Sequence, residues 1–245
     1  MSTEKTIAAI STPPGNSGIG VIRVSGCEVP NLIKKIFKKD LSPREATLRK
    51  IYNQDGMVID KTIAIYYKKP KSYTGEDMLE IHTHGNPIIL DAILESIIGK
   101  SIQHAKPGEF TEKAFLNGKI DLVQAEAVSD LITSRTLASV KGAYNSLSGV
   151  FSKKILEVNE NILELRAKIE STINFPDDQI PENESETLKK DLTTIVKKID
   201  KIAFVANHGI KLNKQNIFCV AGQPNVGKSS LINSMLGQSS SIVSN

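Results

Sequence analysis

A phosphate-binding loop near the end of the printed sequence restricts the fold of this chain more than any other feature. Gly222, Gly227, Lys228 and Ser229 satisfy the pattern G-x-x-x-x-G-K-[ST], between the apolar run IFCVAG and the helix-like run LINSML. The glycines let backbone N–H groups point at phosphates, the lysine supplies a positive charge, and the serine hydroxyl can bind Mg²⁺. Strand, loop and helix in this order predict the start of a nucleotide-binding domain. A glycine-rich turn with an incidental lysine is the less favoured interpretation, and the motif does not distinguish GTP from ATP.

The residues before this loop show two different sequence patterns. Up to about Gly118, the β-rich runs TIAAIST, GVIRVSG, KTIAIYY and MLEIHTH alternate with turns that contain Pro and Gly, and PIILDAILESII predicts a helix. This pattern indicates an α/β or α+β domain. After Lys119, apolar residues at steps of three and four predict two amphipathic helices, separated by FPDDQIPE, that pack as a hairpin. The stripes are Phe151, Ile155, Val158, Ile162, Leu165 and Ile169 in the first helix and Leu188, Leu192, Ile195, Ile199 and Ile202 in the second.

These sequence patterns predict an α+β protein of several domains. The expected domains are residues 1–118, a helical domain over residues 119–213, and a nucleotide-binding domain that begins at residue 214. A hairpin rarely buries both of its apolar stripes, so the helical domain is expected to need a further helix. The third domain is expected to be truncated at residue 245, because one strand, the loop and one helix bury too little surface to fold as a nucleotide domain.

Composition and charge exclude some classes of protein. The chain has 31 Lys and Arg against 27 Asp and Glu, a mild basic excess that tolerates a nucleic-acid partner without implying one. Cys27 and Cys219 lie too far apart in sequence for a disulfide framework or a zinc pattern, and both are expected to be inert, Cys219 because it lies in the apolar strand. No run approaches the roughly 18 apolar residues that span a bilayer. A cytoplasmic protein without a membrane segment is therefore predicted.

Polar residues alternate with apolar ones in two of the β-rich runs. Arg23 lies between Ile22 and Val24, and Glu80, His82 and His84 alternate with Leu79, Ile81 and Thr83. Such a face can be solvated, can line a ligand, or can hold a metal ion, and a metal site is the least favoured of these because no fourth ligand stands at a suitable spacing. Lys119 in a predicted turn and Lys34, Lys35, Lys38 and Lys39 on a predicted helix are typical of solvated positions, with a tRNA-phosphate role for the cluster as a weaker alternative.

Five ordered segments carry a resemblance to a known family. TPPG…GIGVIRVSG, YTGEDMLEIHTHG, KPGEFTEKAFLNGKIDLVQAEAVSDLI, INFPDD and AGQPNVGKSSLIN resemble the MnmE/TrmE family, the tRNA uridine-5-carboxymethylaminomethyl modification GTPases, over essentially the whole chain. The resemblance implies an N-terminal domain similar to folate-binding aminomethyltransferase modules, a helical domain, and a Ras-like GTPase domain inserted into the helical one. Such an insertion would explain the incomplete helical bundle.

The resemblance also implies a function and a set of site residues. A homodimer, formed through the N-terminal domain, would use GTP and a one-carbon unit from a tetrahydrofolate derivative to modify the wobble uridine of tRNA with an FAD-containing MnmG/GidA-like partner. Arg23, Glu80 and Lys119 match the folate contacts of the family, in agreement with the acidic tail and the N–H donors of a folate. The GTP contacts would be Asn225, Val226, Gly227, Lys228, Ser229 and Ser230, with Ser229 as a Mg²⁺ ligand and Asn225 as a K⁺ ligand.

The family's GTTRD-type switch, its DTAG and NKxD motifs, its second helical half and its Cys-containing tail are not found in these 245 residues. Catalytic residues for hydrolysis are therefore not identified, and efficient GTP hydrolysis by this stretch alone is not expected. One alternative is a truncated folate-binding dimerisation module, and another is a folate-dependent aminomethyl transferase with a vestigial phosphate loop. A ribosome-assembly GTPase sharing only the loop would leave residues 1–120 unexplained.

Overall fold

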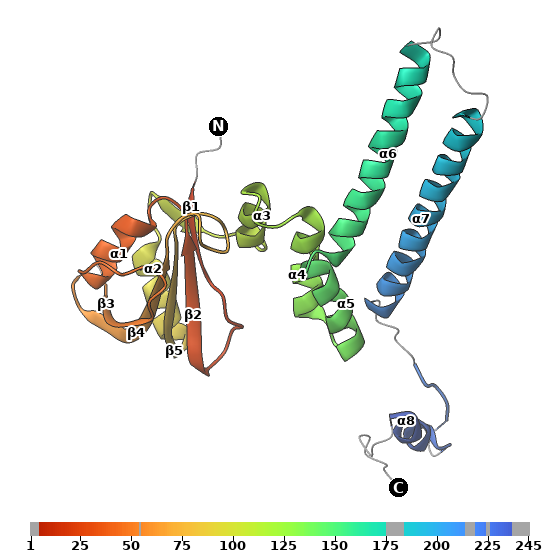
Figure 1. Ribbon diagram of the computed structural model, residues 1–245. Helices are drawn as coiled ribbons and strands as arrows, with labels where there is room; N and C mark the ends of the chain where they lie inside the picture. Colours follow the sequence, from red (N-terminus) through yellow and green to blue (C-terminus); the bar gives the residue numbers. More distant parts are fainter. Residues whose placement is uncertain (1–4, 54, 175–183, 214–218, 224–225, 237–245) are drawn as a thin grey trace.

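A computed structural model describes residues 5–53, 55–174, 184–213, 219–223 and 226–236. Figure 1 shows a sheet with its helices, a group of shorter helices and a pair of long helices following one another along the chain. The predicted breaker FPDDQIPE and the predicted K⁺ ligand Asn225 lie outside the described residues. Within those residues, every helix is too short or too polar to cross a membrane.

The N-terminal part is built on a six-stranded sheet with the strand order β3-β4-β5-β2-β1-β6. Neighbouring strands are antiparallel except β1 and β6, which are parallel. The strands are β1 (Thr6–Ile10), β2 (Ser17–Ser25), β3 (Thr47–Tyr52), β4 (Val58–Tyr67), β5 (Met78–Gly85) and β6 (Ile102–His104). The four β-rich runs of the sequence form β1, β2, β4 and β5, as predicted, whereas β3 and β6 were not foreseen.

Two helices cover one face of this sheet. They are α1 (Val29–Phe37) and α2 (Pro87–Ile97), and their apolar residues form one core with Ile22, Leu79 and Ile81 of the central strands. The side chain of Asn86 accepts a hydrogen bond from the N–H of Ile88, which caps α2 at its start. Because side chains alternate along a strand, the polar residues of β2 and β5 lie on the opposite face. The burial along β5 follows the predicted alternation, with Leu79, Ile81 and Thr83 buried and the residues between them partly or fully exposed.

Three shorter helices connect the sheet to the long helices. They are α3 (Glu109–Leu116), α4 (Leu122–Thr133) and α5 (Leu137–Leu147). The last two begin at reciprocal capping boxes, in which the side chain of Asp121 or Thr136 and the side chain three residues later bond each other's backbone N–H. Lys119 lies in the turn between α3 and α4, as predicted.

The two long helices are α6 (Val150–Asn174) and α7 (Glu184–Asn213), which lie side by side in Figure 1. Val158, Leu165 and Ile195 are buried between them, with Leu188 and Ile202 packed alongside, so the predicted hairpin is confirmed. Two ion pairs, Lys168–Asp191 and Lys198–Glu157, each at 2.8 Å, cross the same contact. Other residues of the predicted stripes stay open to solvent, with Ile162 43% and Leu192 52% exposed. The hairpin therefore buries only part of its two stripes.

The last described helix, α8 (Lys228–Leu236), begins within the phosphate loop. The strand predicted at IFCVAG is wrong for the described part of that run, because Cys219, Val220, Ala221 and Gly222 form no strand and all four are exposed. A strand is held by hydrogen bonds and packing from neighbouring strands, and none of the described residues supplies such a neighbour here. The expectation that Cys219 is enclosed in an apolar strand is wrong for the same reason.

Candidate functional site

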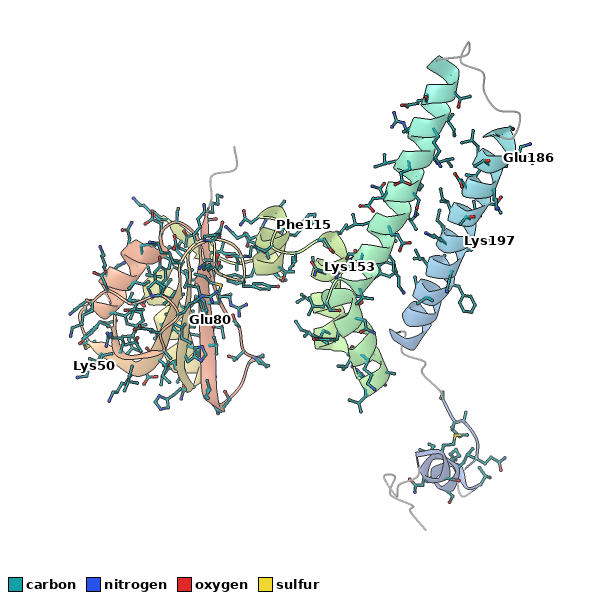
Figure 2. The ribbon with its side chains drawn as sticks, viewed as in Figure 1. Lys50, Glu80, Phe115, Lys153, Glu186 and Lys197 are labelled. Carbon is teal, nitrogen blue, oxygen red and sulfur yellow. The ribbon has the colours of Figure 1, made fainter. Side chains whose placement is uncertain are left out.

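Arg23 and Glu80 form an ion pair at the centre of the exposed sheet face. They are direct partners in the antiparallel register of β2 and β5. Nη2 and Nε of Arg23 donate to the same oxygen, Oε1 of Glu80, at 2.7 and 3.0 Å. The side chains are only 29% and 14% exposed, and Glu80 is labelled on the sheet in Figure 2. The structure thus brings together two of the three predicted folate contacts.

The second oxygen of Glu80 is less fully engaged. Oε2 accepts a hydrogen bond of 3.4 Å from the hydroxyl of Tyr67, and it lies 3.7 Å from Nε2 of His82. Nε2 of His82 is buried and has no hydrogen-bond partner among the described residues. Burial and the neighbouring Glu80 raise the pKa of Tyr67, so its hydroxyl stays protonated and can donate. An acceptor oxygen and an unsatisfied ring nitrogen side by side can receive complementary polar groups of a ligand.

Two aromatic rings flank the Arg23 guanidinium. The guanidinium carbon lies 5.6 Å from the centre of the Tyr73 ring and 5.7 Å from that of Phe110, within the range of cation–π attraction. Tyr73 belongs to residues 68–77, which join β4 to β5, and Phe110 belongs to the first turn of α3. The Tyr73 hydroxyl bonds Thr111 Oγ1 at 2.9 Å, which connects the two segments. Flat rings beside a cation suit a flat, partly anionic ligand.

A buried polar network fixes residues 68–77 in place. The carboxylate of Glu76 accepts hydrogen bonds from Nζ of Lys113 at 2.8 Å and from the hydroxyl of Ser25 at 2.8 Å. The Ser25 hydroxyl is also 2.7 Å from that of Thr74. The loop, β2 and α3 are therefore joined to one another.

Lys119, the third predicted folate contact, is bound to the same loop. Its Nζ donates to the carbonyl of Pro70 at 3.2 Å. The backbone of Gly75 has φ +80°, and a β-carbon there would lie 3.2 Å from Cγ of Lys119, so only glycine lets the loop pass so close to the lysine stem. Within the part of the chain that the structure describes, no hydrogen bond or ion pair joins Lys119 to Arg23 or Glu80 directly.

His84 and Asp60 form a separate polar contact on β5 and β4. Nδ1 of His84 lies 3.0 Å from both carboxylate oxygens of Asp60, which also accepts from the Thr83 hydroxyl. Burial alone would raise the pKa of Asp60, but hydrogen bonds from Thr83, His84 and the Lys61 backbone together lower this pKa to about 2. In the described part of the chain, no three His, Cys, Asp or Glu side chains gather in a way that could hold a metal ion.

In the phosphate loop, the lysine folds back over the loop that precedes it. Nζ of Lys228 donates to the carbonyls of Gly222, at 3.0 Å, and Gln223. Gly227 adopts φ +86°, which suits glycine, and its carbonyl accepts the N–H of Leu231 at the start of α8. Ser229 is half-buried, whereas Val226 and Ser230 are exposed. The described residues fit a phosphate if Lys228 exchanges its carbonyl partners for phosphate oxygens.

Sequence reasoning missed four residues that build the sheet site: Tyr73, Phe110, Glu76 and Lys113. The signal for the two aromatic residues was their position in the Gly- and Pro-containing segments SYTGED and KPGEF, which the sequence marks as turns where ligands bind. Nothing in the sequence links Glu76 to Lys113, because they lie in a loop and in a helix that meet only in the folded chain.

Three family models match the chain in succession. They describe the N-terminus of the GTP-binding protein TrmE (residues 6–119), the MnmE helical domain (residues 122–214) and a 50S ribosome-binding GTPase (residues 217–245). The matches confirm the predicted order of an N-terminal part, a helical part and the start of a GTPase part.

Curated relatives agree with these matches. The chain is 45% identical over 244 residues to the tRNA modification GTPase MnmE of Blochmanniella pennsylvanica and 44% identical over 243 residues to that of Francisella tularensis subsp. holarctica. Each alignment covers 99% of this chain, and 52% and 54% of the two relatives. The chain thus spans about half the length of the curated relatives it matches.

Proposed function

Because the chain belongs to the MnmE family of tRNA modification GTPases, we propose that it forms the folate-binding and GTP-binding front part of an enzyme that modifies the wobble uridine of tRNA. The Arg23–Glu80 pair between Tyr73 and Phe110 is the observation that carries the folate assignment. The proposed domains are residues 1–118, 119–213 and 214–245, and the proposed location is the cytoplasm.

The residues around Arg23 fit a tetrahydrofolate derivative in chemistry. A pterin ring is flat and carries N–H donors, and Oε2 of Glu80, which accepts only a long hydrogen bond from Tyr67, is the acceptor that would receive one of them. Nε2 of His82 lies beside that oxygen and lacks a partner within the described residues. Lys119 would meet the acidic end of the ligand, since a folate ends in a glutamate. When bound, the folate would supply a one-carbon unit, while Arg23, Glu80 and the two aromatic rings hold and orient it.

We assign the phosphate loop to GTP. Val226, Gly227, Lys228, Ser229 and Ser230 would contact the phosphates, together with Asn225 of the undescribed stretch. The Ser229 hydroxyl would bind Mg²⁺, and Asn225 would bind K⁺. The names of the matched GTPases support GTP over ATP. A MnmG/GidA-like FAD protein, tRNA and a second copy of the chain, bound through residues 1–118, are the proposed partners.

The decisive experiment is calorimetric titration of 5-formyltetrahydrofolate into the chain and into Arg23→Ala and Glu80→Ala variants. The matched control is Arg166→Ala, which breaks an exposed Arg–Glu pair on α6 and leaves the sheet untouched. Circular dichroism of each protein verifies that it is folded. We expect saturable binding by the chain and by the control, and a loss of roughly tenfold or more in affinity for each sheet variant, since each loses a charged hydrogen-bonding group.

Absence of saturable binding by the folded chain would overturn the folate assignment. Binding that both sheet variants retain would place the ligand elsewhere on the protein.

A further inference from the structure

A basic hollow lies where the loop after β4 meets the segment before β3. Its volume is about 370 Å³, and it is lined by Pro43, Arg44, Lys68, Lys69, Pro70 and Lys71. All four of the charged residues are exposed. Among the described residues, none of the four forms an ion pair with a carboxylate. Four positive charges around one hollow, without an acidic partner, favour an anionic occupant.

The backbone holds these cations in a defined arrangement. Arg44 adopts φ +65°, an uncommon conformation for a residue with a side chain, and its N–H donates to the carbonyl of Tyr66 at 2.7 Å. Nη2 of Arg44 donates to the carbonyl of Lys71 at 3.1 Å, and the N–H of Lys71 donates to the carbonyl of Lys68 at 2.9 Å. The two segments that line the hollow are thus bonded to each other.

The acidic residue at the base of this loop is already engaged. Oδ1 of Asp77 accepts from the Tyr66 hydroxyl at 2.5 Å and from the N–H of Lys69 at 3.2 Å. Burial and this contact with Asp77 raise the pKa of Tyr66 far above its usual range, so the hydroxyl remains a donor. Asp77 therefore orients the loop and leaves the lysine charges uncompensated.

The same loop connects the hollow to the Arg23–Glu80 pair. Tyr73, which faces Arg23, and Pro70, which accepts the Lys119 hydrogen bond, both belong to residues 68–77. Tyr67, immediately before this loop, bonds Glu80, and its hydroxyl lies within the electrostatic influence of both Arg23 and Arg44. Residues 67–77 thus contribute both to the hollow and to the surroundings of the Arg23–Glu80 pair, and a ligand that followed them would reach both.

We propose that the hollow lined by Arg44, Lys68, Lys69 and Lys71 binds the carboxylates of an oligo-γ-glutamate tail on the folate. This inference rests on the proposed function. Each added γ-linked glutamate contributes one further α-carboxylate, so a longer tail offers a row of negative charges to a row of cations that lack acidic partners. Lys119, whose Nζ donates to the carbonyl of Pro70 in this loop, would meet the first glutamate of the tail.

An RNA backbone is the competing anion. RNA presents phosphates along a strand and is bound by basic residues spread over a wide surface, with interfaces of nucleic-acid-binding modules burying roughly 600 Å² or more. The four cations here surround a single hollow formed by two short segments, and three of them belong to the loop that also carries Tyr73 of the proposed folate site. This arrangement favours the carboxylate tail.

The test compares 5-formyltetrahydrofolate carrying one glutamate with the same compound carrying three, by calorimetry at low salt. We expect the triglutamate to bind roughly five- to tenfold more tightly to the chain, since two further carboxylates each gain an exposed charge contact. In a Lys68→Gln/Lys71→Gln variant the ratio of the triglutamate affinity to the monoglutamate affinity should fall toward one. The affinity of this variant for the monoglutamate should stay within about twofold of that of the unaltered chain. A Lys35→Gln/Lys39→Gln variant removes the same charge from exposed positions at the end of α1 and should keep the ratio.

Three outcomes distinguish failure of the tail inference from failure of the folate assignment. If the monoglutamate binds and depends on Arg23 but tail length has no effect, the tail inference is wrong and the folate assignment stands. If neither compound binds, both fail together. If the Lys68→Gln/Lys71→Gln variant keeps the glutamate ratio but loses affinity for a tRNA anticodon stem-loop, the hollow serves RNA and the tail inference is overturned.

Discussion

Arg23 places two of its nitrogens on one oxygen of Glu80, at 3.0 and 2.7 Å, and leaves the other carboxylate oxygen to weaker contacts. The register of two central strands imposes this geometry, because Arg23 and Glu80 are direct cross-strand partners. The fold itself therefore sets the pair, and the strands fix the direction of the acceptor that it presents.

The first prediction concerns this shared oxygen. In Arg23→Lys a single ammonium replaces the planar guanidinium. Glu80 then loses one of its two hydrogen bonds from residue 23, and its carboxylate is no longer held in a fixed orientation. We expect the affinity for 5-formyltetrahydrofolate to fall by roughly tenfold while the thermal unfolding midpoint changes little. Calorimetry and a melting curve measure the two effects, with Arg166→Lys as the control on α6. Unchanged affinity in Arg23→Lys would show that charge alone, without the planar guanidinium, suffices.

The second prediction concerns the aromatic rings beside Arg23. Tyr73→Leu and Phe110→Leu remove a flat face and are each expected to weaken folate binding by roughly three- to tenfold. Tyr73→Phe keeps the ring and loses only the hydroxyl contact with Thr111, so its affinity should stay close to that of the unaltered chain. Tyr144→Leu, at an exposed position on α5, controls for the loss of any tyrosine. Equal losses in Tyr73→Phe and Tyr73→Leu would assign the effect to the hydroxyl.

The third prediction concerns the buried pair of Lys113 and Glu76. Lys113→Met leaves the Glu76 carboxylate buried without its cation, and we expect the free energy of unfolding to fall by about 3 kcal/mol. Urea denaturation followed by circular dichroism measures this change. Adding Glu76→Gln to Lys113→Met removes the uncompensated charge and should restore part of the stability.

Lys198→Met is the control for Lys113→Met, because it breaks an ion pair exposed to solvent between α6 and α7 and should change stability little. If Lys113→Met and Lys198→Met were equally mild, the buried pair would not hold the loop in place.

The fourth prediction concerns the pH dependence of stability. The pKa of Asp60 is lowered to about 2 in the folded chain, from an ordinary value of 3.8, so its charged form favours the native state. This contribution is complete above about pH 4 and is lost as the pH falls toward 2. Asp60→Asn should therefore be less stable than the unaltered chain by roughly 1–2 kcal/mol at pH 7, with a difference that shrinks between pH 4 and pH 2.

Urea titrations at several pH values test the Asp60 prediction. Asp91→Asn, at an exposed position on α2, is the control and should show no such narrowing. If the free energies of unfolding of Asp60→Asn and the unaltered chain differed by a constant amount down to pH 2, the lowered pKa of Asp60 would not be the cause.

The fifth prediction concerns the long helical hairpin. Leu165 is buried between α6 and α7, so Leu165→Ala should cost about 2–3 kcal/mol and speed amide hydrogen exchange in both helices. Leu163→Ala, at a 52% exposed position of the same helix, is the matched control. Exchange in β2 and β5 should stay slow in both variants. Faster exchange in those strands would show that hairpin and sheet unfold together.

Much of this fold can be predicted from local patterns. Apolar and polar residues alternate along a strand, and apolar residues recur every three or four positions along a helix, so both patterns involve residues close together in the sequence. Alternation placed Arg23 and Glu80 on strands, although their role as folate contacts came from the family resemblance, and steps of three and four gave the stripe containing Leu165. The short strands β3 and β6 were missed, since their runs TLRKIY and IQH carry little apolar signal. The strand expected at IFCVAG failed over its described residues because an apolar run becomes a strand only beside a partner.

The candidate site was predicted only in part, for a related reason. Alternation separated Arg23 and Glu80 from the apolar residues of their own strands, but the pairing of β2 with β5 appeared only in the structure, and no local rule brings Phe110 beside Arg23. Phe110 arrives through α3, which is held by the contact of Lys113 with Glu76 across a large sequence distance. The roles of Lys119 and of the phosphate-loop residues stay predictions.

The Arg23–Glu80 pair lies on strands, whereas the basic hollow is lined by loops, and this difference decides which substitutions the fold tolerates at each. Arg23 and Glu80 lie on central strands, where a shift of one residue would turn both side chains to the opposite face. Arg44, Lys68 and Lys71 instead lie in connections between strands, where substitutions disturb no ladder of hydrogen bonds. A substitution at Arg44, Lys68 or Lys71 would therefore change the charge of the hollow without moving the strands, whereas a shift in the register of β2 and β5 would remove the Arg23–Glu80 pair.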